Sequence, residues 1–253
     1  MKVTLIKPSL GRLAAGPHHE RGRMEPLGLG VLAGLTPPGI DLELYDDRFN
    51  EIDYDEPTDL VAITIETFTA RRSYEISAEY RSRGVPVVMG GIHATLVPEE
   101  VADHASAIYL GDAESSWHQV LADVRAGELR PRYVGTTSRP QSGSTTNRTI
   151  YGRRHYLPLS LIQFGRGCRF RCEFCAVGAY FNHRHYTRPV AEVVAELSQL
   201  PRRNVFFVDD NILSDFEAAK TLFRALIPLN LRWVSQASLD QTSDPELMEL
   251  MVE

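Results

Sequence analysis

Short apolar runs alternate with amphipathic stretches along the first 135 residues. Runs of β-branched and other apolar residues predict strands, and stretches with a 3.6-residue apolar period predict helices. Strands that alternate with helices at this spacing predict an α/β fold, with a doubly wound, Rossmann-like parallel sheet. The predicted strands are 3–6, 41–45, 60–65, 85–89 and 107–110, and the predicted helices are 27–35, 70–83, 98–104 and 114–125.

A second series of strands and helices follows residues 136–150. That segment is rich in Ser, Thr and Gly without an apolar period, so it is predicted to be a linker. Three strand–helix units are too few to close a barrel, and the last predicted helix reaches the final residues, so the chain is expected to be truncated. The second series predicts strands at 159–164, 204–208 and 232–236 and helices at 190–200, 215–227 and 245–252.

The composition is that of a globular protein, and it disfavours several classes of partner. The chain has 253 residues, 43% hydrophobic and 24% charged, with a net charge of −6. An acidic chain is poorly suited to binding a nucleic-acid backbone. No apolar stretch approaches the roughly 18 residues of a transmembrane helix, and residues 1–8 are too short and too polar for a signal peptide. We therefore expect a cytoplasmic protein, in which cysteines serve metals or catalysis more often than disulfides.

All three cysteines of the chain fall within eight residues of one another. Cys168, Cys172 and Cys175 directly follow the predicted strand at 159–164. Three thiolates at this spacing can ligate three irons of one cuboidal cluster and leave the fourth iron open for a substrate. The spacing therefore favours a [4Fe–4S] cluster at this loop.

Two other interpretations of the cysteines compete with the cluster. A zinc site could combine the three thiolates with His183 or His185, but structural zinc sites usually use two separated Cys-x-x-Cys pairs. The cysteines could also be three unrelated buried residues. Their confinement to one short window argues against that coincidence.

The cysteine loop is similar to the signature of the radical S-adenosylmethionine (SAM) enzymes. It reads Cys-x-x-x-Cys-x-x-Cys, with the aromatic Phe174 before the last cysteine, after the first strand of a βα series. The resemblance implies that the three cysteines bind a [4Fe–4S] cluster whose open iron is chelated by the amine and carboxylate of SAM. It further implies cleavage of SAM to a 5′-deoxyadenosyl radical, with Phe174 against the adenine. Residues 151–253 would then be the N-terminal part of a βα barrel.

Acidic residues end the second predicted strand of this barrel. Many radical SAM enzymes have Gly-Gly-Glu there, which holds the methionine amine, whereas this chain has Asp209-Asp210-Asn211. An acidic pair at this point resembles the subgroup with an N-terminal cobalamin-type domain. Asp209 and Asp210 are therefore candidate ligands of the SAM ammonium group, with helix capping as the alternative role. Gln236 or Ser235, at the end of the third strand, is a candidate contact of the SAM ribose.

Loops of the first domain fall at the carboxyl ends of strands, where doubly wound sheets bind ligands. Pro-Leu-Gly-Leu at 26–29, Gly-Gly-Ile-His-Ala-Thr at 90–95 and Gly-Asp-Ala-Glu at 111–114 occur in the order typical of the cobalamin-binding domain fused to many radical SAM enzymes. The resemblance identifies residues 1–135 as such a Rossmann-like domain. The candidate cofactor contacts there are Gly28, Thr64, Gly90, Gly91, His93 and Gly111.

Cobalamin binding itself is left open by the sequence. The chain lacks Asp-x-His-x-x-Gly, the motif whose histidine ligates cobalt in some cobalamin domains. Many members of the subgroup bind cobalamin without that histidine, and others keep the fold without the cofactor. His93 would lie beside the nucleotide tail rather than the metal.

The resemblance implies a cobalamin-dependent methyltransferase acting on an unactivated carbon of a small-molecule or lipid substrate. The implied cofactors are a [4Fe–4S] cluster, SAM and cobalamin, and the implied partner is an electron donor such as flavodoxin or ferredoxin. The alternatives are a radical SAM cyclase or oxidoreductase without methyl transfer and a truncated, inactive ligand-binding protein. A methylthiotransferase would usually carry further cysteines before the barrel, and residues 1–150 contain none.

Overall fold

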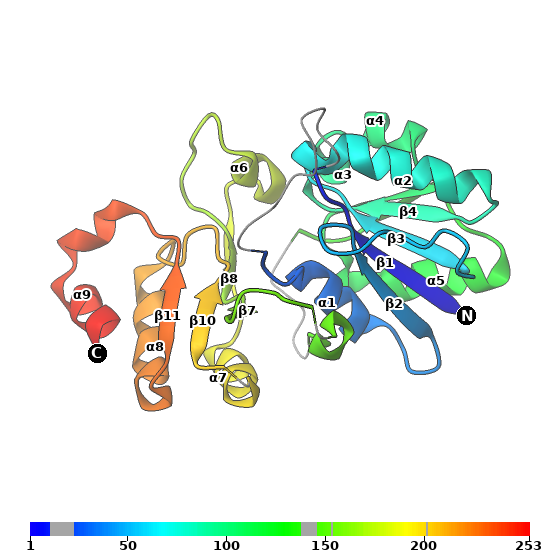
Figure 1. Cartoon of the computed structure of the whole chain (residues 1–253). Helices are drawn as coiled ribbons and strands as arrows, with labels where there is room; N and C mark the ends of the chain where they lie inside the picture. Colours follow the sequence, from blue (N-terminus) through cyan, green and yellow to red (C-terminus); the bar gives the residue numbers. More distant parts are fainter. Residues whose placement is uncertain (11–22, 138–145, 153, 201) are drawn as a thin grey trace, which may run out of the picture. The chain divides into compact units, whose positions relative to one another are not determined.

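The computed structural model describes residues 1–10, 23–137, 146–152, 154–200 and 202–253 (Figure 1). These residues form two compact units. The described residues up to position 155 make up the first unit, and those from 156 to 253 belong to the second. Most of the predicted linker, residues 138–145, lies outside the described residues.

A six-stranded sheet forms the centre of the first unit, and every pair of neighbouring strands in it is parallel. The strand order is β2-β1-β3-β4-β5-β6, which reverses direction between β1 and β3. The predicted α/β class is thus confirmed, and β6 is a strand that the sequence pattern missed. The strands are β1 (Lys2–Lys7), β2 (Asp41–Asp46), β3 (Leu60–Thr64), β4 (Val87–Gly90), β5 (Ala107–Leu110) and β6 (Arg132–Val134).

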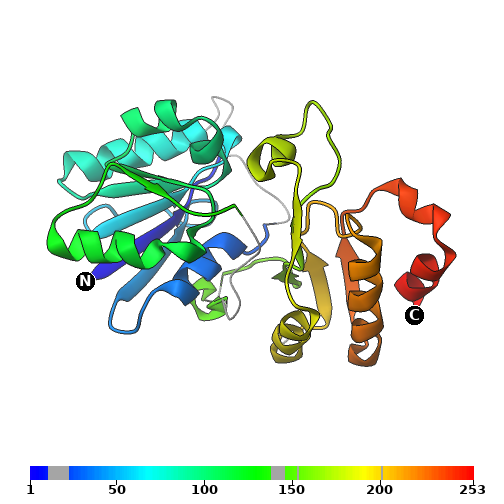
Figure 2. The same cartoon turned by 180° about the vertical axis from the view of Figure 1, so that it is seen from behind.

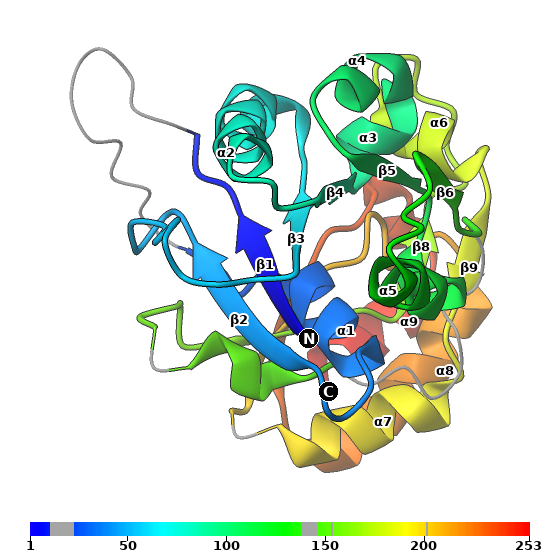
Figure 3. The ribbon, with the colours of Figure 1, turned by 90° about the vertical axis from the view of Figure 1, so that its right-hand side faces the viewer.

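Helices cover both faces of this sheet. Figure 3 shows α2, α3 and α4 on one face and α1 and α5 on the other. On the latter face, the indole Nε1 of Trp117 in α5 donates to Thr36 Oγ1 just after α1, at 3.0 Å. The helices are α1 (Leu27–Leu35), α2 (Ala70–Ser82), α3 (Ile92–Leu96), α4 (Pro98–Asp103) and α5 (Trp117–Ala126).

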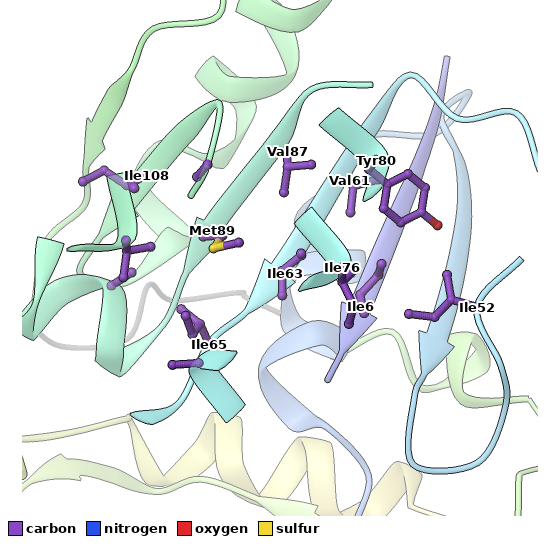
Figure 4. Close-up of a cluster of buried hydrophobic side chains, with 14 residues drawn as sticks. Ile6, Ile52, Val61, Ile63, Ile65, Ile76, Tyr80, Val87, Met89 and Ile108 are labelled. Atoms are coloured by element: carbon purple, nitrogen blue, oxygen red, sulfur yellow. The ribbon is translucent and has the colours of Figure 1, made fainter. Parts of the chain in front are cut away.

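The core between the sheet and α2–α4 explains the apolar character of the central strands. Leu60 through Ile63 of β3 are all buried, as expected for a strand that is covered on both faces. Ile76 and Tyr80 from α2 pack onto the strands (Figure 4). Burial of this surface removes several large apolar side chains from water and stabilises the unit.

A short 3₁₀ turn over Arg148–Tyr151 also packs on the first unit. The buried Tyr151 directs its hydroxyl to the carbonyl oxygen of Pro26, at 3.4 Å. A Cβ on Gly30 would lie only 2.1 Å from that hydroxyl. The glycine in this part of the Pro-Leu-Gly-Leu-Gly stretch is therefore required by packing of the chain on itself.

A smaller parallel sheet, of order β11-β10-β7, organises the second unit. Figure 2 shows α7 and α8 beside its strands, and side chains of α7, α8 and α9 complete its apolar core. The predicted strands and long helices of this unit agree with the structure to within about two residues. They are β7 (Ser160–Ile162), β10 (Asn204–Phe207), β11 (Arg232–Ser235), α7 (Val190–Gln199), α8 (Phe216–Leu226) and α9 (Pro245–Val252).

The second unit also contains an excursion that the sequence pattern did not predict. β8 (Gly165–Gly167) and β9 (His185–Thr187) form an antiparallel pair, and α6 (Ala176–Phe181) lies between them in sequence. The cysteines lie between β8 and α6, so this excursion carries the predicted metal loop.

Among the described residues, no helix has the length and apolar character that crossing a membrane requires.

Replacement of a core residue in the first unit is expected to destabilise it. Ile76→Ala leaves a cavity at a fully buried site and should lower the free energy of unfolding by about 2–5 kcal/mol. Urea unfolding followed by Trp117 fluorescence, in a Trp233→Phe background, measures this effect. The control Val134→Ala changes a side chain that is 68% exposed and should shift stability by no more than about 0.5 kcal/mol. Equal losses for both variants would contradict the assigned core.

Candidate functional site

The cysteine loop joins the end of β8 to the start of α6. Cys168 follows β8 directly, and Cys175 precedes the first residue of α6. All three thiols are free; Cys168 and Cys175 are half-buried and Cys172 is exposed. A backbone hydrogen bond of 3.1 Å from Cys175 N to the Cys172 carbonyl forms a turn between the last two thiols.

Phe174, the candidate adenine contact, lies within that turn. Its side chain is 93% exposed. An exposed aromatic ring beside the last cysteine is available to a ligand, although its role against the adenine stays a prediction.

Close packing explains the two glycines on either side of Arg166. Gly167 has φ +78°, and a Cβ there would lie 2.1 Å from the carbonyl oxygen of Arg184. A Cβ on Gly165 would lie 2.6 Å from His185 Nε2 and 3.0 Å from Asp209 Oδ1. Both glycines are therefore needed for β8 to pass between β9 and the end of β10.

Two carboxylates at the end of β10 hold the backbone that leads into the cysteine loop. Asp209 is fully buried and accepts hydrogen bonds from the backbone N–H groups of Phe164, at 3.0 Å, and Gly165. Asp210 accepts from the N–H of Gly167 at 2.9 Å. Both predicted SAM-binding carboxylates are thus engaged with the chain's own backbone in this structure.

The surroundings of these carboxylates change their acidity. Burial raises the pKa of Asp209 to about 7, opposed by the hydrogen bonds from Phe164 and Gly165 and reinforced by the neighbouring charge of Asp210. Burial also raises the pKa of Asp210. Near neutral pH, Asp209 is therefore poised between its two protonation states.

Asn211 connects this acidic turn to the first cysteine, although the sequence assigned it no role of its own beyond capping. Its Nδ2 lies 3.8 Å from Cys168 Sγ and 3.1 Å from Ser238 Oγ. Its Oδ1 accepts from the backbone N–H groups of Leu213, at 3.1 Å, and Ser238, at 3.4 Å. The position next to two acidic residues at a strand end was the only sequence signal for this residue.

Gln236 follows β11, and its carbonyl oxygen accepts from Ile212 N at 3.0 Å, so it lies close to Asn211 in the fold. Its side chain is exposed. The hydroxyl of Ser235 donates instead to the carbonyl oxygen of Phe207, at 3.0 Å. Of the two candidates for the ribose, Gln236 has the more accessible side chain.

The histidines of the zinc alternative have different surroundings. His183 is exposed and packs on Gly178 of α6. His185 is half-buried beside Gly165; burial lowers its pKa, and its Nε2 has no hydrogen-bond partner among the described residues.

The donor chemistry of the loop matches an iron–sulfur cluster. Within the described ranges, no three His, Cys, Asp or Glu side chains are arranged to hold a metal ion. Three free thiols on one loop are nevertheless the set of ligands that such a cluster uses. The residues therefore fit the group that the sequence predicts.

Most of the candidate cofactor residues of the first unit gather at one edge of its sheet. Thr64 and Gly90 end the neighbouring strands β3 and β4, and Gly111 follows β5. Gly91 has φ +110°, and a Cβ there would lie 2.9 Å from the carbonyl oxygen of Ile65. Gly28 differs, because it lies exposed in the first turn of α1 with open space around it.

His93, also predicted to be near a cofactor, is buried and engaged through both ring nitrogens. Nδ1 lies 3.2 Å from Thr67 Oγ1, and Nε2 lies 3.3 Å from the hydroxyl of Tyr74 and 3.8 Å from Glu100 Oε1. The imidazole thus joins α3 to α2 and α4. In this arrangement neither nitrogen is offered to a metal.

Comparison with known proteins finds a family match within the second unit. Residues 162–253 match the radical SAM superfamily. The chain is 39% identical over 160 residues to bacteriochlorophyllide d C-8(2)-methyltransferase of Chlorobaculum tepidum. That match covers 59% of this chain and 35% of the relative. It is 27% identical over 238 residues to bacteriochlorophyllide d C-12(1)-methyltransferase of the same organism. That match covers 89% of this chain and 52% of the relative.

Further relatives cover both units. The hopanoid C-2 methylase of Rhodopseudomonas palustris is 24% identical to this chain over 247 residues. That match covers 91% of this chain and 46% of the methylase. The solved structure of TsrM, a radical SAM methyltransferase from Kitasatospora setae with tryptophan and a SAM analogue bound, superposes with a TM-score of 0.65 at 19% identity. That match covers 98% of this chain and 53% of TsrM, and it supports the fold. The chain spans about half or less of the length of these relatives.

The buried Asp209 is expected to make stability depend on pH. Because its pKa is raised on folding, its favourable contribution is fully present below the unfolded pKa near 4 and is lost as the pH rises through about 7, with a total of up to about 4 kcal/mol. Asp209→Asn removes this titration and should flatten the decline in unfolding free energy between pH 5 and pH 8. A residual slope should remain from Asp210, whose pKa is also raised.

Urea unfolding at a series of pH values, followed by Trp233 in a Trp117→Phe background, measures the slope. The control Asp240→Asn removes an exposed carboxyl whose pKa is lowered chiefly by a hydrogen bond from Ser238, so it should leave the slope above pH 5 unchanged. If the slopes of wild type and Asp209→Asn coincide, the burial of a titrating carboxyl at this site is refuted.

Proposed function

Because residues 162–253 match the radical SAM superfamily, we propose that the chain holds a [4Fe–4S] cluster on Cys168, Cys172 and Cys175 and uses it to cleave SAM. The observation that carries this proposal is the anchored cysteine loop. Its three thiols are free, and the backbone that leads into it is bonded to the carboxylates at the end of β10. A radical reaction needs the open iron in a fixed place, which this anchoring favours.

The chain's own residues would divide the work of binding. The three thiolates ligate three irons and leave the fourth for SAM; when bound, the cluster supplies the electron that cleaves the cofactor. Phe174 covers the adenine, and Gln236 contacts the ribose. Asp209 and Asp210 act on SAM only if they exchange their present backbone partners for its ammonium group; otherwise they fix the loop.

We infer cobalamin as the second cofactor, bound by the first unit. Thr64, Gly90, Gly91 and Gly111 lie together at the carboxyl edge of the sheet, where doubly wound folds bind ligands. Because both ring nitrogens of His93 are already engaged, cobalt would receive no imidazole ligand from that residue. Cobalamin can carry a methyl group, and relatives named as methyltransferases or methylases are in keeping with such a cofactor.

The reaction proposed is methyl transfer to an unactivated carbon of a small-molecule or lipid substrate. The names of the relatives refer to bacteriochlorophyllides and hopanoids, whereas the structural neighbour TsrM was solved with a tryptophan substrate. A flavodoxin or ferredoxin in the cytoplasm would supply electrons. A radical SAM cyclase or oxidoreductase remains the second candidate, favoured if SAM is cleaved without methylation of cobalamin.

Cluster assembly is expected to require each of the three cysteines. Anaerobic reconstitution with iron and sulfide should give about four irons per chain, and reduction in the presence of SAM should release 5′-deoxyadenosine. Cys168→Ala, Cys172→Ala and Cys175→Ala should each abolish that product and reduce iron content, because two thiolates hold a cluster poorly. The measurements are iron analysis and chromatography of the nucleoside.

The control is a check that each Cys→Ala variant remains folded. Unfolding of the second unit, followed by Trp233 fluorescence, provides that check. An iron-replete wild-type chain that releases no 5′-deoxyadenosine would sink the proposed chemistry. A chain that binds one zinc in place of four irons would favour the alternative metal site.

Cobalamin bound by the first unit is expected to lack a histidine ligand. His93→Gln should leave the electron paramagnetic resonance spectrum of added cob(II)alamin unchanged, because both ring nitrogens of His93 are engaged within the chain. Gly91→Val should weaken binding at least tenfold, because a side chain at φ +110° distorts the edge of the sheet. The matched control is Gly127→Val, at another glycine of positive φ (+72°), which follows α5 and has open space around it. Nitrogen splitting that His93→Gln removes would refute the assignment.

A further inference from the structure

Three consecutive residues after β10 contact successive points of the segment that enters the cysteine loop. Asp209 binds the N–H groups of Phe164 and Gly165, and Asp210 binds that of Gly167. Asn211 continues the series at the next residue, where its side-chain amide faces the sulfur of Cys168. The acidic turn therefore sets the register of the whole entry segment, and its last contact falls on the first thiol.

The orientation of the Asn211 amide is fixed by its other partners. Two backbone N–H groups, of Leu213 and Ser238, point at Oδ1. A flipped amide would direct its own N–H groups at these donors, which is unfavourable. The NH₂ group must therefore be the end that faces Cys168 Sγ at 3.8 Å and Ser238 Oγ at 3.1 Å, and its two hydrogens match these two acceptors.

Burial makes this contact specific. Asn211 is 4% exposed, so water does not readily replace its partners. Within the described residues, the side chains that Asn211 bonds to are those of Cys168 and Ser238. A buried amide with its oxygen doubly satisfied has a defined direction for the remaining donor.

We propose that Asn211 is a positioning residue that donates a hydrogen bond to the sulfur of Cys168 when that sulfur ligates the cluster, and that this bond raises the cluster's reduction potential. The inference rests on the proposed function, because it requires a cluster at Cys168. Reduction adds negative charge to the cluster, part of it on the ligand sulfurs. A donor aimed at one of those sulfurs stabilises the reduced form more than the oxidised form.

A purely structural role for Asn211 gives a different expectation. If the side chain only joins the ends of β10 and β11, its replacement changes stability and leaves the potential of an assembled cluster unchanged. Ser238→Ala separates these cases, because it removes the other acceptor of the same NH₂ group and leaves the contact with Cys168 in place.

The test is a redox titration of the reconstituted full chain, in which electron paramagnetic resonance measures the reduced [4Fe–4S] signal. Asn211→Ser is neutral, keeps a short acceptor for the Leu213 N–H and is too short to reach the sulfur. It should make reduction about tenfold less favourable, a shift of about 59 mV to lower potential for a one-electron couple. Asn211→Asp should shift the potential at least as far, and Ser238→Ala should match wild type.

The outcomes separate this inference from the proposed function. If the cluster of Asn211→Ser has the wild-type reduction potential, the inference is overturned. This holds whatever the potential of Asn211→Asp, because the charge of the Asp side chain alone could shift that potential. Loss of the cluster from both Asn211 variants, with Ser238→Ala intact, also overturns it in favour of a structural role. A wild-type chain that assembles no cluster would instead refute the proposed function.

Discussion

The hydrogen bonds from the backbone of residues 164–167 to Asp209 and Asp210 are the interactions on which the candidate site depends. Between β8 and α6 the cysteine segment makes few regular hydrogen bonds of its own, so its place is set where it leaves the sheet. The two carboxylates fix that point from the neighbouring strand. Burial of Asp209 costs free energy, and its backbone donors offset part of that cost. The result is a defined first thiol on an otherwise exposed loop.

Close packing by glycine serves the same purpose in both units. Gly165 and Gly167 let β8 pass beside β9 and the buried carboxylate, and Gly91 lets the chain turn against β3. Gly30 admits the hydroxyl of Tyr151. Several of the glycines that mark the loops in sequence are thus explained by contacts within the chain, and the same contacts shape the edges where cofactors are proposed to bind.

The strands and long helices were predictable because their apolar patterns are local. Residues 27–35, 107–110 and 245–252 match α1, β5 and α9. Two of the missed strands lack such a pattern: β8 is Gly-Arg-Gly, and β6 is a three-residue edge strand. The cysteine loop was found from spacing alone, and the radical SAM assignment was confirmed. The backbone engagement of Asp209, the bonds of His93 and the reach of Asn211 depend on distant partners, which no local pattern encodes.

The central claim is that three thiolates hold a cluster with one iron left for SAM. Mössbauer spectroscopy of the ⁵⁷Fe-reconstituted chain tests it most directly, because it resolves individual irons. The account predicts a [4Fe–4S] spectrum in which addition of SAM changes the parameters of one iron in four. A spectrum with all four irons unaffected by SAM, or a chain that retains no cluster, would contradict it.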